Sequence, residues 1–325
     1  MTVDASWPTT TYPRRQTCLT DSYDNRFDQG ETVRNRRVFR SAVLGVTGIA
    51  LAAGITTLAS AAPAHQTAPV ALSRSTANAP KPTIVLVNGA WSDAASWVSV
   101  VKPLQAAGYP VVAPPTSLRS VSGDSAYLAS YLKTIQGPIV LVGQSYGGFV
   151  ITNAATHNPN VTALVYISAF APDTDDTVES LTAKFPGSQI TNDPHAQIPT
   201  ALSPVLYTNA DTGGTEVDLY AKPDQYRNLF LSNRVSASTA AELAATQSPI
   251  NSAALTQKSG EPAWASIPSW ALVSDADHVI PPATERFMAT RAHSHIVEAN
   301  TPHAAQVTNP GIVVDLIERA VAATR

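Results

Sequence analysis

Six nearly continuous apolar segments occur in the part of the chain that follows residue 82. Stretches long enough to form helices separate them, and one interval is much longer than the others. Continuous apolar runs are typical of parallel strands covered by helices on both faces, whereas half-exposed strands alternate apolar and polar residues. The pattern predicts an α/β fold with a doubly wound, mostly parallel sheet of about six strands, at residues 83–89, 110–115, 139–144, 161–169, 269–275 and 295–300.

The segments between these strands have the apolar spacing of helices. The last of them places Val313, Ile317 and Val321 on one side at helical spacing, so we expect it to close the domain against the sheet. The predicted helices occupy residues 94–107, 122–135, 147–157, 283–292 and 310–323.

The long interval covers residues 171–262. About ninety residues are too many for a structureless loop inside a compact domain. Short helical patterns within it predict a mostly helical lid inserted into the sheet domain. We expect its aromatic residues to form the core of the lid rather than to contact substrate; they include Tyr207, Tyr220, Tyr226 and Phe230.

The first 40 residues are polar and lack apolar periodicity, which predicts a disordered leader. Arg36 and Arg37 then precede an apolar core at 42–58 and a run of small residues. This is the layout of an export signal, and paired arginines are typical of the bacterial Tat pathway. We therefore expect residues 41–61 to be a signal peptide and the protein to be secreted or extracytoplasmic, in a bacterium.

Cleavage is expected after Ala61, with Ala64 as the second choice, and would leave no stable membrane association. An uncleaved N-terminal membrane anchor is the alternative, because the apolar core has nearly the ~20 residues that span a bilayer. Residues 62–81 are rich in Ala, Pro, Thr and Ser and are predicted to be a linker before a folded domain at 82–325. The only cysteine, Cys18, lies in the leader, so the cleaved chain would have no internal disulfide.

The charge distribution argues against nucleic acid as a partner. The formal net charge is −3, and no cluster of Lys and Arg follows residue 75. Binding of a phosphate backbone requires clustered cations. A metal site is not expected either, because the His293 and His295 pair has no third ligand at a suitable spacing.

The segment "IVLVGQSYGGFVI" contains the pattern Gly143-x-Ser145-x-Gly147 between a predicted strand and a predicted helix. Alone, this pentapeptide would usually be a flexible turn. Between a strand and a helix, the serine occupies a strained turn in which nearby side chains would collide, so glycines are needed around it. The amide of Tyr146 would then point towards an oxyanion, and Ser145 is the predicted nucleophile.

Two later loops supply candidate partners for this serine. His303 follows the last predicted strand, and Asp275 and Asp277 follow the strand before it. The carboxyl ends of parallel strands meet at one edge of the sheet, so these side chains should lie within reach of Ser145. A histidine there can accept the serine proton, and a carboxylate can hold its tautomer.

These features resemble the α/β-hydrolases, and most of all the branch of bacterial esterases, plant methylesterases and hydroxynitrile lyases. The resemblance extends from residue 83 to the end of the chain and rests on "VLVNGAW", "LVGQSYGG", "LVYISAFAP", "DADHVIPP" and "TPHAAQ". It implies the amides of Ala90 and Tyr146 as oxyanion donors and favours Asp277 over Asp275 as the acid. Asn88 departs from the family, which has histidine there, and Gly89 could instead merely end a strand.

The resemblance further implies hydrolysis of a carboxylic ester through an acyl-enzyme on Ser145, without a cofactor. The low charge favours a small or medium apolar ester. A lyase using the same triad as acid and base stays possible, although the lysine usual near the acid is absent. A perhydrolase or haloperoxidase shares every motif, while Ser145 in place of aspartate disfavours a dehalogenase. A non-catalytic binding relative is the remaining alternative.

Overall fold

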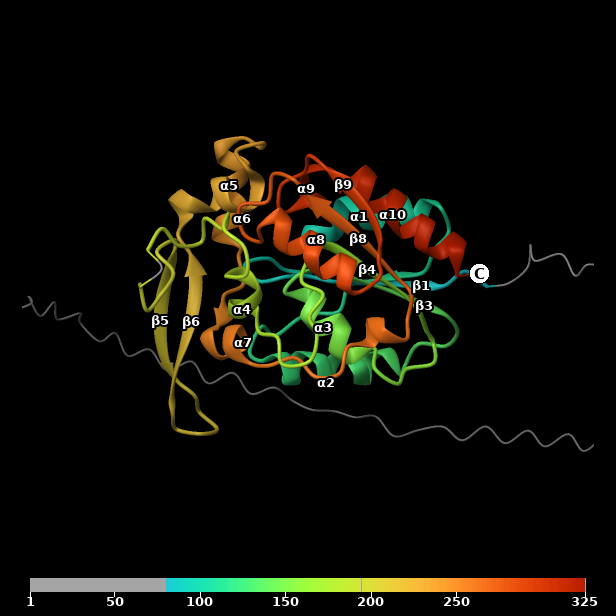
Figure 1. Ribbon diagram of the computed structural model, residues 1–325, viewed down its shortest axis with the longest axis horizontal. Coiled ribbons are helices and arrows are strands. Elements are labelled where there is room, and N and C mark those ends of the chain that lie inside the picture. Colours follow the sequence, from blue (N-terminus) through green and yellow to red (C-terminus); the bar gives the residue numbers. More distant parts are fainter. Residues whose placement is uncertain (1–79, 194, 325) are drawn as a thin grey trace, which may run out of the picture. The chain divides into compact units, whose positions relative to one another are not determined.

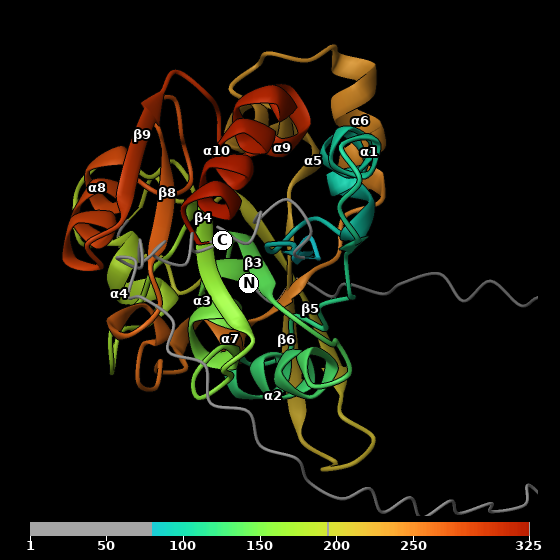
Figure 2. The ribbon, with the colours of Figure 1, turned by 90° about the vertical axis from the view of Figure 1, so that its right-hand side faces the viewer.

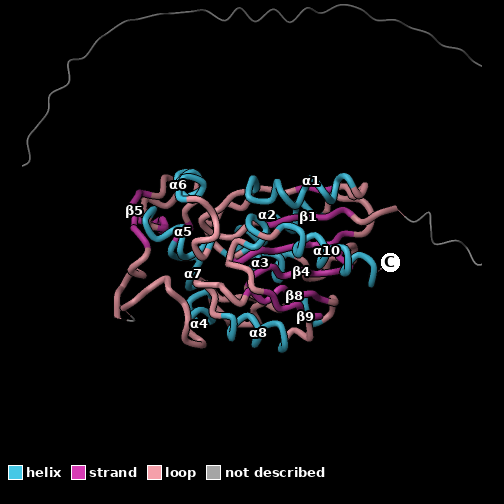
Figure 3. The backbone as a smooth tube through the Cα atoms, turned by 90° about the horizontal axis from the view of Figure 1, so that it is seen from above, coloured by secondary structure: helices cyan, strands magenta, loops and turns pink. Residues whose placement is uncertain are grey.

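All six predicted strands form one parallel sheet in the computed structural model, which describes residues 80–193 and 195–324. Their order across the sheet is β2-β1-β3-β4-β8-β9, and Figure 3 shows β1, β4, β8 and β9 in this order. The second strand is shorter than expected. The strands are β1 (Thr83–Val87), β2 (Val111–Val112), β3 (Ile139–Ser145), β4 (Val161–Ala169), β8 (Ser269–Ser274) and β9 (His295–Ala299).

The five predicted helices are also present, and they cover both faces of the sheet (Figures 1 and 2). Helices α1 and α10 pack on one face, and α2, α3 and α8 pack on the other. A short helical turn, η2 (Ala94–Trp97), precedes α1, and α9 (Ala305–Thr308) precedes α10. The main helices are α1 (Val98–Ala106), α2 (Val121–Leu132), α3 (Gly147–Ala154), α8 (Pro282–Arg291) and α10 (Pro310–Ala323).

The first strand shows why the apolar runs are continuous. Ile84 and Leu86 pack towards α1 and α10, whereas Val85 and Val87 pack towards α2 and α3. All four side chains are buried. Since successive residues of a strand point to opposite faces, a sheet covered on both sides requires apolar residues at every position.

The expected helices of the insertion are present, but strands accompany them. The chain between β4 and β8 contains a three-stranded antiparallel sheet in the order β5-β6-β7, and Figure 1 shows β5 and β6 apart from the main sheet. Pro204 lies in the edge strand, where a missing N–H is tolerated but the sequence signal is weakened. The elements are α4 (Val178–Thr182), β5 (Leu202–Thr208), β6 (Thr215–Ala221), α5 (Pro223–Leu231), α6 (Ala237–Ala245), β7 (Ile250–Asn251), α7 (Ser252–Thr256) and η3 (Ala263–Ala265).

The aromatic residues of this insertion divide into two groups. Tyr226 and Phe230 on α5 are buried, as expected for a core. Tyr207 and Tyr220 on the antiparallel strands are only half-buried. The Tyr207 hydroxyl donates a hydrogen bond to Glu216 on the neighbouring strand, so its role in the insertion is polar as well as apolar.

The predicted leader and signal peptide, residues 1–61, lie outside the described residues, as does nearly all of the linker at 62–81. Within the part that the structure describes, no helix is both long and apolar enough to cross a bilayer.

Candidate active site

Ser145 ends β3, and only Tyr146 separates it from the start of α3. Its φ is 53°, in the left-handed region that residues with a side chain rarely adopt. Such strain persists only where the surroundings impose it, and it is often found at functional positions. The turn therefore places the Ser145 side chain at the carboxyl edge of the sheet, as the sequence predicted.

The glycines around Ser145 are required by close backbone contacts. A Cβ on Gly143 would lie 2.6 Å from the carbonyl oxygen of Gly147, and a Cβ on Gly147 would lie 2.5 Å from that of Val87. The tightest contact involves Gly148, where a Cβ would come within 1.9 Å of the Phe170 carbonyl oxygen. Helix α3 can therefore pack this close to β1 and β4 only with small residues in its first turn.

His303 lies between Ser145 and Asp277 and contacts both. Its Nε2 is 2.9 Å from Ser145 Oγ, and its Nδ1 is 2.6 Å from Asp277 Oδ2. Because a carboxylate only accepts hydrogen bonds, Nδ1 carries the proton and Nε2 is free to accept the hydroxyl proton of Ser145. The three residues come from the ends of β3, β8 and β9 and are nearly fully buried, which strengthens these interactions.

The two candidate acids have different surroundings. Asp277 Oδ1 accepts hydrogen bonds from the amides of Val279 (2.6 Å) and Ile280 (2.9 Å), which fixes its other oxygen against His303. The side chain of Asp275 is 47% exposed and forms an ion pair with Arg286 at 3.7 Å. Of the two, the structure brings Asp277 to the histidine.

Gln144 and Phe230 hold His303 in place, and neither was singled out for this role in the sequence. Gln144 Nε2 donates to the His303 carbonyl oxygen at 3.1 Å. The ring of Phe230 lies 5.9 Å from the imidazole, centroid to centroid, and its carbonyl oxygen accepts the Ala304 amide. The position next to Ser145 could have suggested Gln144, whereas nothing local in the sequence links α5 to His303.

The backbone of Gly89 passes directly beside Ser145 and leads to Ala90. In the part of the chain that is described, neither the Ala90 amide nor the Tyr146 amide donates to a protein acceptor. Asn88 braces this loop, because its Nδ2 donates to the carbonyl oxygens of Gly89 (3.0 Å) and Ser92 (3.1 Å). Asparagine at this position therefore holds the loop by hydrogen bonds.

The side chain of Tyr146 is anchored away from the serine. Its hydroxyl donates to Asp124 Oδ2 at 2.8 Å, and burial, together with the charge of Asp124, raises its pKa far above the ordinary value. The other oxygen of Asp124 accepts hydrogen bonds from Ser117 and Leu118. The phenol thus stays protonated and fixes the start of α3. Asp124 is a buried charge within α2 that sequence reasoning missed.

A model of the Alpha/beta hydrolase family matches residues 84–316. This match covers more than half of the chain. The chain belongs to the alpha/beta hydrolase family. The family's fold accounts for the parallel sheet and for the placement of the serine, histidine and aspartate at its carboxyl edge.

Two curated relatives match part of this alpha/beta hydrolase. One is a carbendazim hydrolyzing esterase of Nocardioides sp. (strain SG-4G), 32% identical over 113 residues, which are 31% of this chain and 47% of the relative. The other is a pyrethroid hydrolase of Sphingobium wenxiniae, 32% identical over 126 residues, which are 35% of this chain and 44% of the relative. The matched region spans less than half the length of each relative.

Among solved structures, a polyneuridine aldehyde esterase has the same fold. It superposes with a TM-score of 0.61 at 17% identity, over 74% of this chain and 98% of the other. This likeness concerns the fold alone.

An aromatic cluster in this alpha/beta hydrolase reaches the imidazole of His303 through Phe230. Trp91 follows β1, and Tyr226 and Phe230 lie on α5 of the insertion; we call these three residues the aromatic cover. The Phe230 ring is 5.5 Å from that of Trp91 and 4.6 Å from that of Tyr226. The Tyr226 hydroxyl also donates to the Trp91 carbonyl oxygen at 2.8 Å. The insertion is therefore fastened to the loop that carries Ala90.

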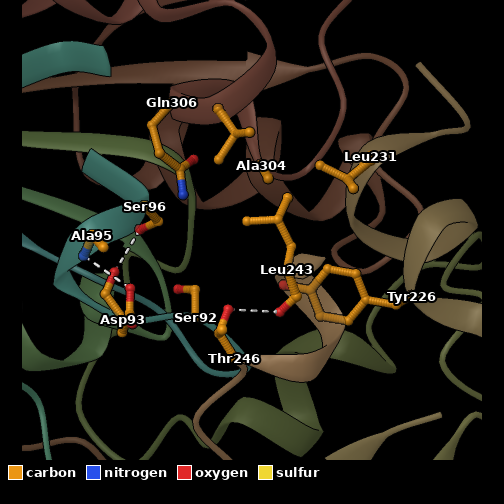
Figure 4. A pocket seen from close by; sticks show the side chains of 11 residues that line it. Ser92, Asp93, Ala95, Ser96, Tyr226, Leu231, Leu243, Thr246, Ala304 and Gln306 are labelled. Atoms are coloured by element: carbon orange, nitrogen blue, oxygen red, sulfur yellow. Dashed lines mark hydrogen bonds between the residues drawn. The ribbon is translucent and has the colours of Figure 1, made fainter. Parts of the chain in front are cut away.

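A cavity of about 210 Å³ lies next to the aromatic cover (Figure 4). It is bounded by η2, by α5 and α6, and by the residues that follow His303. Ser145 does not line it, and the serine itself is only 2% exposed. The lining residues are Ser92, Asp93, Ala95, Ser96, Tyr226, Leu231, Leu243, Thr246, Ala304, Gln306 and Val307.

The His293 and His295 pair forms no metal centre in the structure. His295 stacks on Trp270, with ring centroids 4.9 Å apart. Among residues 80–193 and 195–324, no three His, Cys, Asp or Glu side chains are grouped so that they could hold a metal ion.

Proposed function

We propose that this protein is a serine hydrolase that cleaves carboxylic esters through an acyl-enzyme on Ser145. One observation carries this proposal: an unbroken hydrogen-bonded series from Ser145 Oγ through His303 to Asp277, with the serine on a strained turn. A serine hydroxyl is a weak nucleophile by itself, and a base held by a carboxylate activates it.

The geometry supports a two-step reaction. Ser145 Oγ attacks the ester carbonyl carbon while its proton passes to His303 Nε2, and the carbonyl oxygen gains the negative charge. When the tetrahedral intermediate collapses, the C–O bond to the alcohol breaks and the imidazolium protonates the leaving oxygen. Water, deprotonated by His303, then hydrolyses the acyl-enzyme and the hydroxyl of Ser145 is restored.

The amides of Ala90 and Tyr146, which have no acceptor among the described residues, are the proposed donors to the developing oxyanion. Both amides lie next to Ser145. Ala90 follows Gly89, whose backbone packs against the serine, and Tyr146 is the residue after it. Such donors stabilise the transition state more than the ground state, and each typically contributes ~3 kcal/mol.

The proposed substrate is a small or medium apolar ester. The Phe230 ring packs beside His303, and the names of two relatives describe hydrolases of carbendazim and of pyrethroids. Because Ser145 and His303 are almost fully buried, a substrate must displace neighbouring side chains to reach them, and the Phe230 ring beside the imidazole is the proposed one. The acyl and alcohol groups that bind best should therefore be those that replace aromatic contacts.

We further propose that the protein is exported from a bacterial cell by the Tat pathway. The support is the order of three features along the chain: the arginine pair Arg36 and Arg37, then the apolar core, then the run of small residues that ends at Ala61. Expression with both arginines replaced by lysine should leave the protein in the cytoplasm, whereas the natural chain should appear outside it, shortened after Ala61. Full-length protein retained in the membrane fraction would favour the anchor instead.

The test of catalysis uses the purified chain, a fluorophosphonate probe and a short-chain nitrophenyl ester. The natural protein should be labelled and should release nitrophenol, and Ser145→Ala should do neither while keeping its circular dichroism spectrum. A folded natural protein that neither labels nor turns over ester would instead support a non-catalytic binding role.

A further inference from the structure

A second buried carboxyl group, Glu285, lies beside Ser274 at the end of β8. It belongs to the first turn of α8 and is 3% exposed. Its Oε2 accepts the amide proton of Ser274 at 2.7 Å. Its Oε1 is buried and, within the described part of the chain, receives no hydrogen bond. A buried carboxylate oxygen without a donor is costly, so the protonation of this group needs explanation.

Asp277 and Glu285 both lie at Ser274. The Ser274 amide donates to Glu285 Oε2 at 2.7 Å, the Asp277 amide donates to the Ser274 carbonyl oxygen at 3.1 Å, and the two carboxyl groups interact. Asp277 accepts hydrogen bonds from two amides and from His303, so these three partners are all donors and Asp277 is the ionised member of the pair. Two buried carboxylates in contact cannot both be ionised at modest cost. Burial, followed by the charge of Asp277, raises the pKa of Glu285 well above its ordinary range.

Among the described residues no cation forms an ion pair with Glu285, although the charge of Arg286 also acts on it. Asp275 adds a further negative charge. Arg286, the next residue on α8, directs its guanidinium to Glu298 and Asp275 at the surface. The neighbouring polar groups on β8 and after β9 are hydroxyls, since Ser274 Oγ is 2.7 Å from Thr301 Oγ1. Glu285 can therefore stay buried because its carboxyl group is protonated and neutral.

We propose that Glu285 is a positioning residue that keeps its proton at neutral pH and donates it in a hydrogen bond from Oε1 to the Asp277 carboxylate. Asp277 is then held by donors on every side: two amides, the imidazole and a carboxylic acid. This fixes the carboxylate that orients His303. The role in catalysis rests on the function proposed above, but the protonation of Glu285 does not.

Two substitutions of Glu285 test whether its side chain acts as a hydrogen-bond donor. In Glu285→Gln the amide oxygen can still accept from Ser274 and the amide nitrogen can donate to Asp277, so the variant imitates the protonated acid. Glu285→Leu keeps the volume but removes the donor. We expect kcat/KM of Glu285→Gln to stay within about threefold of the natural protein and that of Glu285→Leu to fall about tenfold, as for the loss of one hydrogen bond to a charged group.

The pH profile distinguishes a neutral from an ionised Glu285. Replacing a neutral group by an amide should leave the acidic limb of kcat/KM unchanged in Glu285→Gln. Removal of a buried negative charge beside the triad would move this limb by about one pH unit, which would overturn the proposal. A Gln variant as inactive as the Leu variant would overturn it as well.

The direct measurement is the infrared difference spectrum between the natural protein and Glu285→Gln at neutral pH. We expect the carbonyl stretch of a protonated carboxylic acid in the natural protein and its loss in the variant. The same comparison in the Ser145→Ala background requires no turnover, so it reports on Glu285 even if ester hydrolysis is not found. Absence of this band in both backgrounds would show that Glu285 is ionised. This readout also stands if Glu285→Leu fails to fold.

Discussion

Gly89 and Ser145 lie so close that a Cβ on Gly89 would stand 2.5 Å from the Cβ of Ser145. The same Cβ would be 2.7 Å from Gln144 Oε1 and 2.9 Å from the Gln144 carbonyl oxygen. The backbone of the loop after β1 therefore packs directly against Gln144 and Ser145, and the position of the Ala90 amide depends on this contact.

Replacing Gly89 with alanine should push this loop away from the serine. We expect Gly89→Ala to lower kcat by ~10²-fold, as for the loss of one oxyanion donor, with a smaller change in KM. Gly213→Ala is a suitable control, because no atom lies within 4 Å of a Cβ built there, although its φ of 69° carries some strain. Steady-state kinetics with a nitrophenyl ester make the comparison. Equal activity of both variants would show that Ala90 supplies no donor.

The two neighbouring aspartates provide a matched pair of substitutions. Asp277→Asn should reduce kcat by ~10⁴-fold, because the amide can no longer hold the tautomer of His303 that accepts the serine proton. Asp275→Asn should change it by less than about threefold, since this side chain is half-exposed and only pairs with Arg286. The reverse order of the two effects would identify Asp275 as the acid.

The aromatic cover should restrict which esters reach Ser145. Phe230→Leu removes the ring that contacts Trp91, Tyr226 and His303, so kcat/KM for esters with bulky acyl groups should rise relative to short ones. Phe185→Leu is the control, because Phe185 is exposed and its ring pairs with Phe287 instead. A panel of nitrophenyl esters graded by acyl length gives the ratio. An unchanged ratio in Phe230→Leu would place the substrate path elsewhere.

Glu285 should also make stability depend on pH. Its pKa in the folded protein is raised above the ordinary value of 4.5, so the folded state binds more protons than the unfolded state and stability falls as pH rises from there towards the folded value. The free energy of unfolding of Glu285→Gln relative to the natural protein should therefore increase by about 1.4 kcal/mol per pH unit over this range. Urea titrations between pH 5 and pH 8 would measure it, and a constant difference would contradict the raised pKa.

The strand pattern and the serine motif were readable from the sequence because each reflects a local demand. Strands covered on both faces need apolar residues at every position, and the turn at Ser145 needs its glycines. The antiparallel strands of the insertion were missed because β5 exposes Val205 and Leu206 and contains a proline, so no regular alternation marks it. Contacts with the rest of the fold, rather than local sequence pattern, determine that these segments are strands.

Buried polar groups were the other features that the sequence did not reveal. Asp124 and Glu285 resemble ordinary charged residues on helices, and only the packing of α2 and α8 turns them inwards. Their partners, Tyr146 and Asp277, are 22 and 8 residues away in the chain, a relation that helical or strand spacing does not encode. Such contacts follow from the fold rather than from local pattern.

Trapping of the acyl-enzyme tests the central claim most directly. The natural protein is mixed with a nitrophenyl ester, quenched in acid during turnover, digested and analysed by mass spectrometry. We predict that the mass of the acyl group is found on the peptide that carries Ser145, that it accumulates to a higher level when deacylation is slowed, and that Ser145→Ala shows none. Ester turnover with the acyl group on another residue, or undiminished turnover by Ser145→Ala, would contradict the account.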